Sequence, residues 1–213
     1  MVLALTVARE DQGLARVGAM TCEVTAAPAQ DPALDGPLEA AARAVQSGAG
    51  LDTGPARSLY RAIGLDPTKT RPSSEALLRR VLRGEALGRI NTLVDLCNWC
   101  SLEVQLPYGL YDLDRVRPPV EVRRGRPGEE YAGIRKDVVH LAGRLVVADA
   151  DGPFGNPTSD SARTMVTIEA RRILVVVFGP ATMATAAMGR VLDMTTARLA
   201  EFARGRETWR WVS

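Results

Sequence analysis

Ile173-Leu-Val-Val-Val-Phe178 is the longest uninterrupted apolar run in a chain of 213 residues. A short apolar run rich in β-branched residues is typical of a buried strand, and it is far shorter than the ~20 residues that cross a bilayer. Other segments with strand-like patterns lie on both sides of it along the chain. These further strands are expected at residues 2–9, 19–27, 120–122 and 137–149, with a last strand that carries Trp209 and Trp211.

Helical spacing of apolar residues predicts several helices between these strands. Three of them are expected at residues 38–45, 57–63 and 181–204, the last with a break at Gly189. A fourth helix is expected to start at Ser73, as its N-cap, and to end at Gly84 or Gly88. A fifth is expected to carry a buried stripe of Ile90, Leu93, Val94, Cys97 and Cys100. Residues 107–114 are expected to form a loop or a short strand. With no internal repeat and no clear linker, the pattern predicts one α/β (α+β) domain over residues 1–213. Its helices should pack on a mixed, largely antiparallel sheet.

The composition excludes several classes of protein. With one histidine, His140, the chain has no HExxH motif and no multi-histidine metal site, so neither a metal nor another cofactor is expected. Three cysteines are too few for a disulfide framework and favour a reducing compartment. The first ten residues lack the cationic start of a signal peptide. We therefore expect a cytoplasmic protein without a membrane partner, and the sequence does not indicate its oligomeric state.

Basic residues concentrate in the middle of the chain, although its net charge is only +2. Residues 57–89 carry eight basic and three acidic side chains, and residues 115–126 add five arginines. Such clustering is typical of a surface that binds a polyanion, and a solvated helix face would have the same pattern. The candidates for polyanion contact are Lys69, Arg71, Arg79, Arg80 and Arg83.

Three short polar residues, Asn91, Asp95 and Asn98, line up beside the buried stripe of the predicted helix over residues 90–100. Buried polar groups need hydrogen-bond partners. Two interpretations stay open: these side chains tie down neighbouring loops, or they line a polar pocket. The Cys97-Asn-Trp-Cys100 motif lies inside the helix, so we interpret it as core packing, because redox and zinc sites place such pairs elsewhere.

The segment over residues 151–164 is the best candidate site in the sequence, because glycines and prolines bend the backbone and polar side chains supply donors and acceptors. A structureless loop of this length is often functional, and a well-capped surface loop is the alternative. His140 is interpreted as structural, with a pairing to Ser159 or Ser161 left open. The candidates for ligand binding are Pro153, Phe154, Gly155, Asn156, Ser159, Arg163 and Thr164, and the candidates for catalysis are Asp160 and Ser161.

Several motifs, taken in order, resemble a known family. They are Asn91-Thr-Leu-Val-Asp-Leu-Cys-Asn98, Leu106-Pro107, Tyr111-Asp-Leu-Asp114, Leu145-Val-Val-Ala-Asp149 and Phe154-Gly155. Together they resemble the B3/B4 domain, the editing module in the beta chain of bacterial phenylalanyl-tRNA synthetase. The stretch from Tyr60 to Arg79 resembles the free-standing variant of that domain, and the resemblance covers about residues 57–180.

The resemblance implies an editing-type function, namely hydrolysis of a mischarged aminoacyl-tRNA. The family's binding asparagine matches Asn98, preceded by Cys97 where the family has threonine. Gly109 stands where the family has histidine, and the position of its glutamate falls near Pro157 in a lengthened segment. Gly109 therefore joins the candidate ligand-binding residues.

Two functions of different classes remain open. One is an aminoacyl-tRNA deacylase that acts in trans, with tRNA or aminoacyl-tRNA as its partner and the central basic residues on the tRNA backbone. The alternative is a non-catalytic module that binds a small amino acid-like ligand or tRNA through the same pocket.

Overall fold

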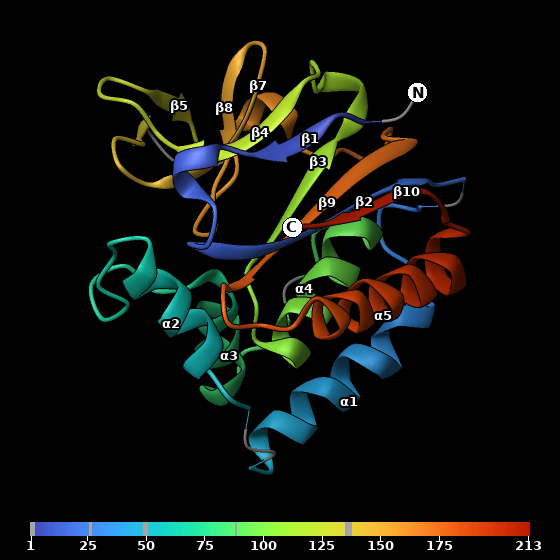
Figure 1. The fold of residues 1–213 in the computed structure, drawn as a ribbon. Helices are drawn as coiled ribbons and strands as arrows, with labels where there is room; N and C mark the ends of the chain where they lie inside the picture. The colour runs from blue at the N-terminus through green and yellow to red at the C-terminus, as the bar shows by residue number, and fades with distance from the viewer. Residues whose placement is uncertain (1–2, 26, 49–50, 88, 135–137) are drawn as a thin grey trace.

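Two four-stranded sheets and a layer of helices make up the fold of the computed structural model, which describes residues 3–25, 27–48, 51–87, 89–134 and 138–213 (Figure 1). The central sheet has the strand order β10-β2-β9-β3. Its strands are β10 (Arg206–Val212), β2 (Ala15–Glu23), β9 (Arg172–Pro180) and β3 (Tyr108–Asp112). All its neighbouring strands are antiparallel.

Strand β9 contains the apolar run and is buried on both faces. Successive side chains of a strand point to opposite faces. Leu174, Val176 and Phe178 therefore enter a core between the two sheets, with Val17 and Ala19 of β2. The alternate residues, Ile173, Val175 and Val177, enter a second core beneath the helices. Two cores leave no face of β9 for polar residues, which explains the uninterrupted apolar run.

The second sheet has the strand order β1-β4-β7-β8 and lies on the side of the central sheet opposite the helices (Figure 1). Its strands are β1 (Leu5–Val7), β4 (Val120–Arg124), β7 (Leu145–Asp149) and β8 (Gly152–Gly155). β1 and β4 are parallel, whereas the other pairs are antiparallel. β5 (Glu130–Ala132) and β6 (Val138–His140) form a separate antiparallel hairpin. The predicted mixed, largely antiparallel α/β fold is therefore confirmed.

The helices lie on the other side of the central sheet (Figure 1). They are α1 (Asp35–Gln46), α2 (Gly54–Ala62), α3 (Ser73–Leu82), α4 (Thr92–Val104) and α5 (Thr185–Ala203). Short 3-10 turns occur at Arg9–Asp11, Pro32–Leu34, Leu113–Arg115 and Ala162–Thr164. Leu59, Tyr60 and Ile63, from α2 and its C-cap, pack instead into the core between the sheets. Within the described residues no helix combines the length and the apolar character that a membrane crossing requires.

Several predicted element boundaries are wrong. The predicted strand over residues 137–149 is two strands within its described part, residues 138–149, because the chain turns at Gly143, whose φ is +73°. The predicted loop over residues 151–164 contains strand β8. Helix α5 runs through Gly189 without a break. These differences share a cause: tertiary pairing and packing decide the boundaries, and local residue preferences are a weak guide to them.

Two helix starts also differ from the predictions. The N-cap of α3 is Pro72, and the Ser73 hydroxyl donates to the carbonyl of Pro157 at 3.1 Å. Ile90 precedes α4 and is exposed, so it does not belong to the buried stripe.

Gly84 follows the end of α3 with a φ of +82°, as a helix stop requires. The alternative stop, Gly88, lies outside the described residues.

A buried carboxylate joins helices α2 and α3. Glu75 is 3% exposed and accepts two hydrogen bonds from Arg57, of 2.8 and 2.7 Å, and one from Arg79 at 3.2 Å. Arg71 lies farther away, with its Nε 3.9 Å from the same carboxylate. The hydrogen bonds from Arg57 hold the pKa of Glu75 below its ordinary value, so the carboxylate stays charged and fixes the arginines around it.

Tyr111 of β3 links the two sheets. Its ring packs edge-on against Phe154, with 4.8 Å between centroids, and both side chains are fully buried. Gly109 and Gly155 lie around its hydroxyl, and a Cβ at either position would overlap that hydroxyl. Tyr111 therefore occupies the space that larger side chains at 109 and 155 would need.

Replacing Gly109 by alanine should lower the free energy of unfolding by about 1–3 kcal/mol, because the buried Tyr111 ring has no room to move away. Gly189→Ala is the matched control. Nothing lies within 4 Å of a Cβ at this helical position, so alanine should stabilise the protein by about 0.5–1 kcal/mol. Urea unfolding measures both changes. Unchanged stability of Gly109→Ala would contradict the packing described.

The Glu75→Gln variant should be less stable than the wild type at pH 7, because glutamine loses the charge-assisted bonds of Arg57. A carboxyl group with a lowered folded-state pKa contributes stability above its ordinary pKa and loses it as the pH falls through the lower value. The difference from the wild type should therefore shrink below about pH 4. Unfolding measured across pH checks this, with the exposed Glu39→Gln as the control. A difference that did not change with pH would contradict it.

Candidate functional site

A cavity of about 420 Å³ opens between helices α3 and α4, the edge strand β3 and the segment over residues 158–166. Segments far apart in the sequence contribute to it. Its lining residues are Arg71, Ser73, Ala76, Leu77, Arg80, Val94, Cys97, Asn98, Ser101, Tyr108, Leu110, Ile134, Thr158, Asp160, Met165 and Val166. The walls combine apolar side chains with about as many polar or charged ones, and a concave site of this kind suits a small ligand.

The charges of the cavity have a defined arrangement. The Asp160 carboxylate has an oxygen, Oδ1, that is shielded from solvent. The side chains of Arg71 and Arg80 are 41% and 48% exposed, so they belong to the rim. The cavity therefore has a negative group inside and positive groups at its mouth.

Helix α4 places only one of its three aligned polar residues in the cavity. Asn98 lines it. Asn91 is the N-cap of α4, and its side chain accepts a hydrogen bond from the Val94 amide at 3.0 Å. Asp95 accepts 2.9 Å bonds from the Arg89 side chain and from the Ile90 amide. Asn91 and Asp95 thus hold neighbouring backbone in place, as the first interpretation expects. Asn98 lines the pocket, as the second interpretation expects.

The CxxC cysteines are free thiols within the core. Burial raises the pKa of both Cys97 and Cys100, so neither forms a reactive thiolate readily. Cys100 accepts a weak 3.5 Å hydrogen bond from Arg198, whereas Cys97 also lines the cavity. Their positions agree with the interpretation as core packing.

Most predicted ligand-binding residues of the 151–164 segment hold the segment together instead. Phe154 is in the core beside Tyr111. The Asn156 side chain accepts from the Thr158 and Ser159 amides at 2.7 and 3.0 Å, forming an Asx-type turn. Its amide nitrogen donates to the Tyr131 hydroxyl at 2.7 Å. These bonds fix the loop that carries Thr158 and Asp160 into the cavity.

The end of this segment is also structural. The Ser161 hydroxyl accepts from the Arg163 amide at 3.0 Å, and Ser161 is 2% exposed. Arg163 pairs with the buried Asp149 at 2.8 Å and lies over the Phe154 ring at 5.7 Å. Of the residues predicted in this segment, Asp160 lines the cavity, whereas Pro153, Phe154, Gly155, Asn156, Ser159, Ser161, Arg163 and Thr164 are not among its lining residues.

Two tyrosines lie beside Asp160. Burial first, and then the Asp160 charge, raise the pKa values of Tyr111 and Tyr131. Both phenols therefore stay protonated at neutral pH. The Tyr131 hydroxyl donates to the carbonyl of Ser159 at 2.6 Å, which holds the backbone next to Asp160. Two neutral hydroxyl groups on fixed segments thus lie beside the carboxylate.

His140 is not part of this site. Its side chain is 80% exposed, and its Nδ1 lies 3.1 Å from Glu130 across the β5–β6 hairpin. The described residues give it no hydrogen bond to Ser159 or Ser161. They also contain no group of three His, Cys, Asp or Glu side chains placed to hold a metal ion. His140 thus contacts a neighbour within its own hairpin and lies outside the cavity.

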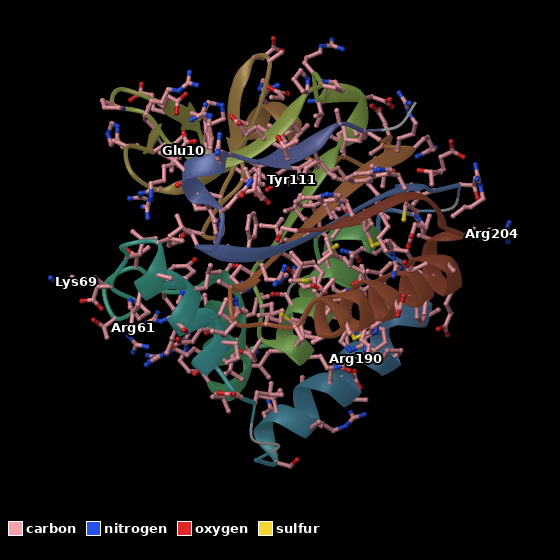
Figure 2. The ribbon with its side chains drawn as sticks, in the orientation of Figure 1. Glu10, Arg61, Lys69, Tyr111, Arg190 and Arg204 are labelled. Atoms are coloured by element: carbon pink, nitrogen blue, oxygen red, sulfur yellow. The ribbon has the colours of Figure 1, made fainter. Side chains whose placement is uncertain are left out.

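The predicted polyanion-binding residues lie on α3 and the loop before it. Arg79 bonds to Glu75, whereas Arg80 and Arg83 share Glu85 at 3.4 and 2.7 Å. Lys69 and Arg61 point away from the body of the protein on the same side (Figure 2). Of the predicted polyanion-binding residues, Arg71 and Arg80 line the cavity.

Gly109, which the resemblance matches to a histidine, is not among the lining residues of the cavity. It faces Tyr111, whose hydroxyl fills the space of any side chain at this position. Pro157, near the expected position of the glutamate, presents its carbonyl to Tyr60 at 2.9 Å and to Ser73. The structure thus gives a local reason for the glycine at position 109.

Sequence reasoning missed most of the cavity wall. Ala76, Leu77, Tyr108, Ile134 and Met165 come from separate elements, and each has the pattern of an ordinary core residue. Only their contact in three dimensions marks them as a wall, so no local signal identifies them.

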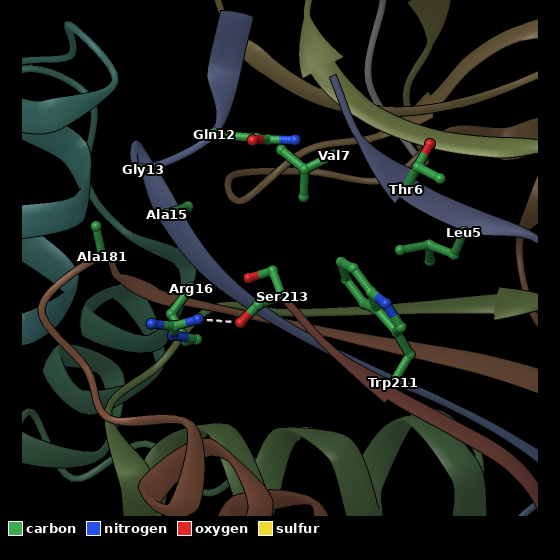
Figure 3. Close-up of a pocket in the computed structure, with 10 residues that line it drawn as sticks. All are labelled: Leu5, Thr6, Val7, Gln12, Gly13, Ala15, Arg16, Ala181, Trp211 and Ser213. Carbon is green, nitrogen blue, oxygen red and sulfur yellow. Dashed lines mark hydrogen bonds between the residues drawn. The ribbon is translucent and has the colours of Figure 1, made fainter. Parts of the chain in front are cut away.

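Sequence reasoning also missed a second cavity, of about 480 Å³, between the edge strands β1 and β10 (Figure 3). Leu5, Val7 and Trp211 form its apolar part, with the Trp211 ring next to Leu5. Arg16 donates to the carbonyls of Met183, at 2.9 Å, and of Ser213. The Arg16 guanidinium thus links the backbone before α5, at Met183, to the backbone after β10, at Ser213.

Comparison with known proteins relates this geometry to a family. The family described as the B3/4 domain matches residues 55–212. The phenylalanine–tRNA ligase beta subunit of Xanthomonas campestris pv. campestris is 32% identical over 180 residues, which cover 82% of this chain and 22% of that subunit. The subunit of Streptomyces avermitilis is 33% identical over 93 residues, covering 43% of this chain and 11% of its own length. The chain thus spans a minor part of these relatives.

A solved structure shares the fold. It is an N-terminal fragment of the phenylalanyl-tRNA synthetase beta subunit from Pyrococcus horikoshii, with a TM-score of 0.56 and 13% identity. The match covers 100% of this chain and 56% of the fragment. The resemblance drawn from the sequence motifs is therefore confirmed, and the chain belongs to the B3/4 domain family, a tRNA-synthetase-related family.

Proposed function

We propose that the chain binds the aminoacyl end of a tRNA in the cavity between α3, α4 and β3 and hydrolyses the ester bond of a mischarged tRNA in trans. The observation that carries the proposal is the cavity itself. Apolar walls that suit an amino acid side chain surround Asn98, the residue that matches the family's binding asparagine, and arginines stand at the mouth.

The size and lining of the cavity support an aminoacyl ligand. About 420 Å³ is within the range of small-molecule sites and accommodates an amino acid with part of a nucleoside. Leu77, Val94 and Val166 give the ligand side chain an apolar surface. The Asn98 amide offers one donor group and one acceptor. This combination suits an ester whose carbonyl needs a donor and whose side chain needs burial.

The arginines support a nucleic acid on the outside. Arg71 and Arg80 line the cavity and remain partly exposed, so a phosphate next to the bound end can reach both of them. Glu75 holds Arg57 and Arg79 by hydrogen bonds, whereas Arg71 is 3.9 Å from the carboxylate. Arg71 is thus the least constrained of the three guanidinium groups around Glu75.

The hydrolysis requires few protein groups. A water oxygen forms a bond with the ester carbonyl carbon, and the bond from that carbon to the ribose oxygen breaks. The proton goes to the ribose oxygen, and a free amino acid and a tRNA hydroxyl result. The Asn98 side chain donates to the carbonyl oxygen as negative charge develops on it. The neighbouring ribose hydroxyl of the tRNA assists the attacking water.

Binding without hydrolysis is the second candidate function. It is favoured by Gly109, which stands where the family has a histidine, and by Tyr111, which leaves no space for that histidine. In this case the same cavity binds an amino acid-like molecule or the tRNA end and releases it unchanged. The two candidates differ in turnover and share the binding site.

A panel of tRNAs, each charged with a mismatched amino acid, should contain at least one that loses its amino acid faster with the protein than in buffer. Asn98→Ala should slow this release at least tenfold, because a donor to the carbonyl oxygen is lost. Gln12→Ala, in the second cavity, is the matched control and should keep the rate. Release of radiolabelled amino acid measures the rates. Binding of charged tRNA without release from any of them would favour the second candidate.

Arg71→Gln and Arg80→Gln should each weaken binding of tRNA and reduce the slope of log affinity against log salt by about one. Each removed phosphate contact releases about one counterion fewer. Arg190→Gln, on helix α5 away from the cavity, is the matched control and should leave the slope unchanged (Figure 2). Filter binding at several salt concentrations measures the slope. Equal slopes for all three variants and the wild type would contradict the proposed path of the tRNA.

A further inference from the structure

We infer that the cavity between α3, α4 and β3 takes aminoacyl groups with apolar side chains and discriminates against side chains of the same shape that carry a hydrogen-bond acceptor in place of a carbon atom. This inference rests on the proposed function, because it names the substrate class of the same cavity. The hydrogen bonds of the hydroxyl groups in the cavity wall carry it.

Two serines of the wall use their hydroxyl hydrogens within the protein. Ser73 donates to the Pro157 carbonyl at 3.1 Å, and Ser101 donates to the Leu106 carbonyl at 2.7 Å. A serine hydroxyl has a single hydrogen. Each of these oxygens can therefore accept a hydrogen bond from a ligand, whereas neither can donate one without giving up its present partner.

Tyr108 also uses its hydrogen within the protein. Its hydroxyl lies 3.0 Å from the hydroxyl of Thr195, and Thr195 in turn donates to the Val191 carbonyl at 2.9 Å. Because a carbonyl can only accept and Thr195 has one hydrogen, both contacts are satisfied together only if Tyr108 donates to Thr195. Thr195 is 1% exposed, so this chain of bonds is shielded from solvent.

Thr158 is held in the same way by Tyr60. The Tyr60 hydroxyl donates to the Pro157 carbonyl at 2.9 Å and lies 2.9 Å from the Thr158 hydroxyl. Because Tyr60 has used its one hydrogen, Thr158 is the donor in the second contact. Tyr60 is fully buried in the core between the sheets, which fixes its hydroxyl at this place. The Thr158 hydrogen is therefore not available to a ligand.

The wall thus offers few donors to a ligand. Among the described lining residues, the other side-chain donors are the Asn98 amide, the weakly donating Cys97 thiol, and Arg71 and Arg80 at the rim. In the proposed complex Asn98 binds the ester carbonyl, and the arginines bind phosphate. An acceptor atom in the ligand side chain loses its hydrogen bonds to water and gains none from the wall hydroxyls, which disfavours binding.

The test compares 3′-aminoacylamino-adenosines, whose amide bond resists hydrolysis, by calorimetry. A first panel carries each of the twenty amino acid side chains. We expect apolar side chains among the tightest binders, and carboxylate and amide side chains among the weakest. Matched pairs then differ by one acceptor atom: norvaline and O-methylserine, norleucine and O-ethylserine, phenylalanine and pyridylalanine. In the pair that best matches the tightest binder, the carbon compound should bind about tenfold more tightly.

Tyr60→Phe tests the assignment of the wall hydrogens. The variant releases the hydrogen of Thr158, which can then donate to the acceptor atom of the ligand. The preference for the carbon compound should therefore fall about threefold, with the affinity for the carbon compound itself retained. Thr208→Val is the matched control, because it removes a 2.8 Å hydroxyl pair with Thr21 away from the cavity lining and should leave the preference unchanged.

The outcomes separate this inference from the proposed function. Equal affinity of the wild type for both members of the pair, a carboxylate or amide side chain as the tightest binder, or an unchanged preference in Tyr60→Phe would overturn the inference and leave the proposed function standing. Binding of none of the twenty compounds would overturn the proposed function itself. The wild-type comparison needs no variant, so a folding defect of Tyr60→Phe does not prevent a decision.

Discussion

The burial of strand β9 on both faces is the constraint on which the rest of the structure depends. Its side chains alternate between the core of the two sheets, through Leu174 and Val176, and the core under the helices, through Val175 and Val177. Each face buries apolar area that stabilises one layer against the strand. The pairing with β9 therefore fixes the position of β3 between the two cores. β3 is the edge strand of this sheet, and its residues line the cavity. A polar residue within the run would bury a polar group in one of the two cores, which costs free energy unless the group finds a hydrogen-bond partner.

The fold was largely predictable from the sequence, and the site was predictable only in part. The apolar run of β9 and the helical stripes of α4 and α5 each follow from a local period. Asn98 and Asp160 were also candidates, one from its family match and the other from its loop. The sequence did not distinguish Asn98 from Asn91, because cap and pocket residues have the same chemistry and differ only in the contacts that the fold brings to them. Wall residues such as Ala76 and Met165 have no polar signature at all.

The region around Tyr111 leaves no space for the histidine that the resemblance places at position 109. Two glycines, Gly109 and Gly155, make room for one large phenol that joins the sheets. The space of a side chain at position 109 is thereby used for packing, and Asn98 and Asp160 are among the polar residues that line the cavity. The backbone amides of Thr158 and Ser159 donate to the Asn156 side chain, which fixes the loop that carries Asp160. Packing and site chemistry are thus linked through the same few residues.

The most direct test of the central claim is a crystal structure of the protein with a non-hydrolysable 3′-aminoacylamino-adenosine. We expect density for the aminoacyl group between α3, α4 and β3, with its carbonyl at Asn98 and the nucleoside toward Arg71 and Arg80. Density for the same compound in the cavity between β1 and β10, beside Trp211, with the first cavity empty, would contradict it.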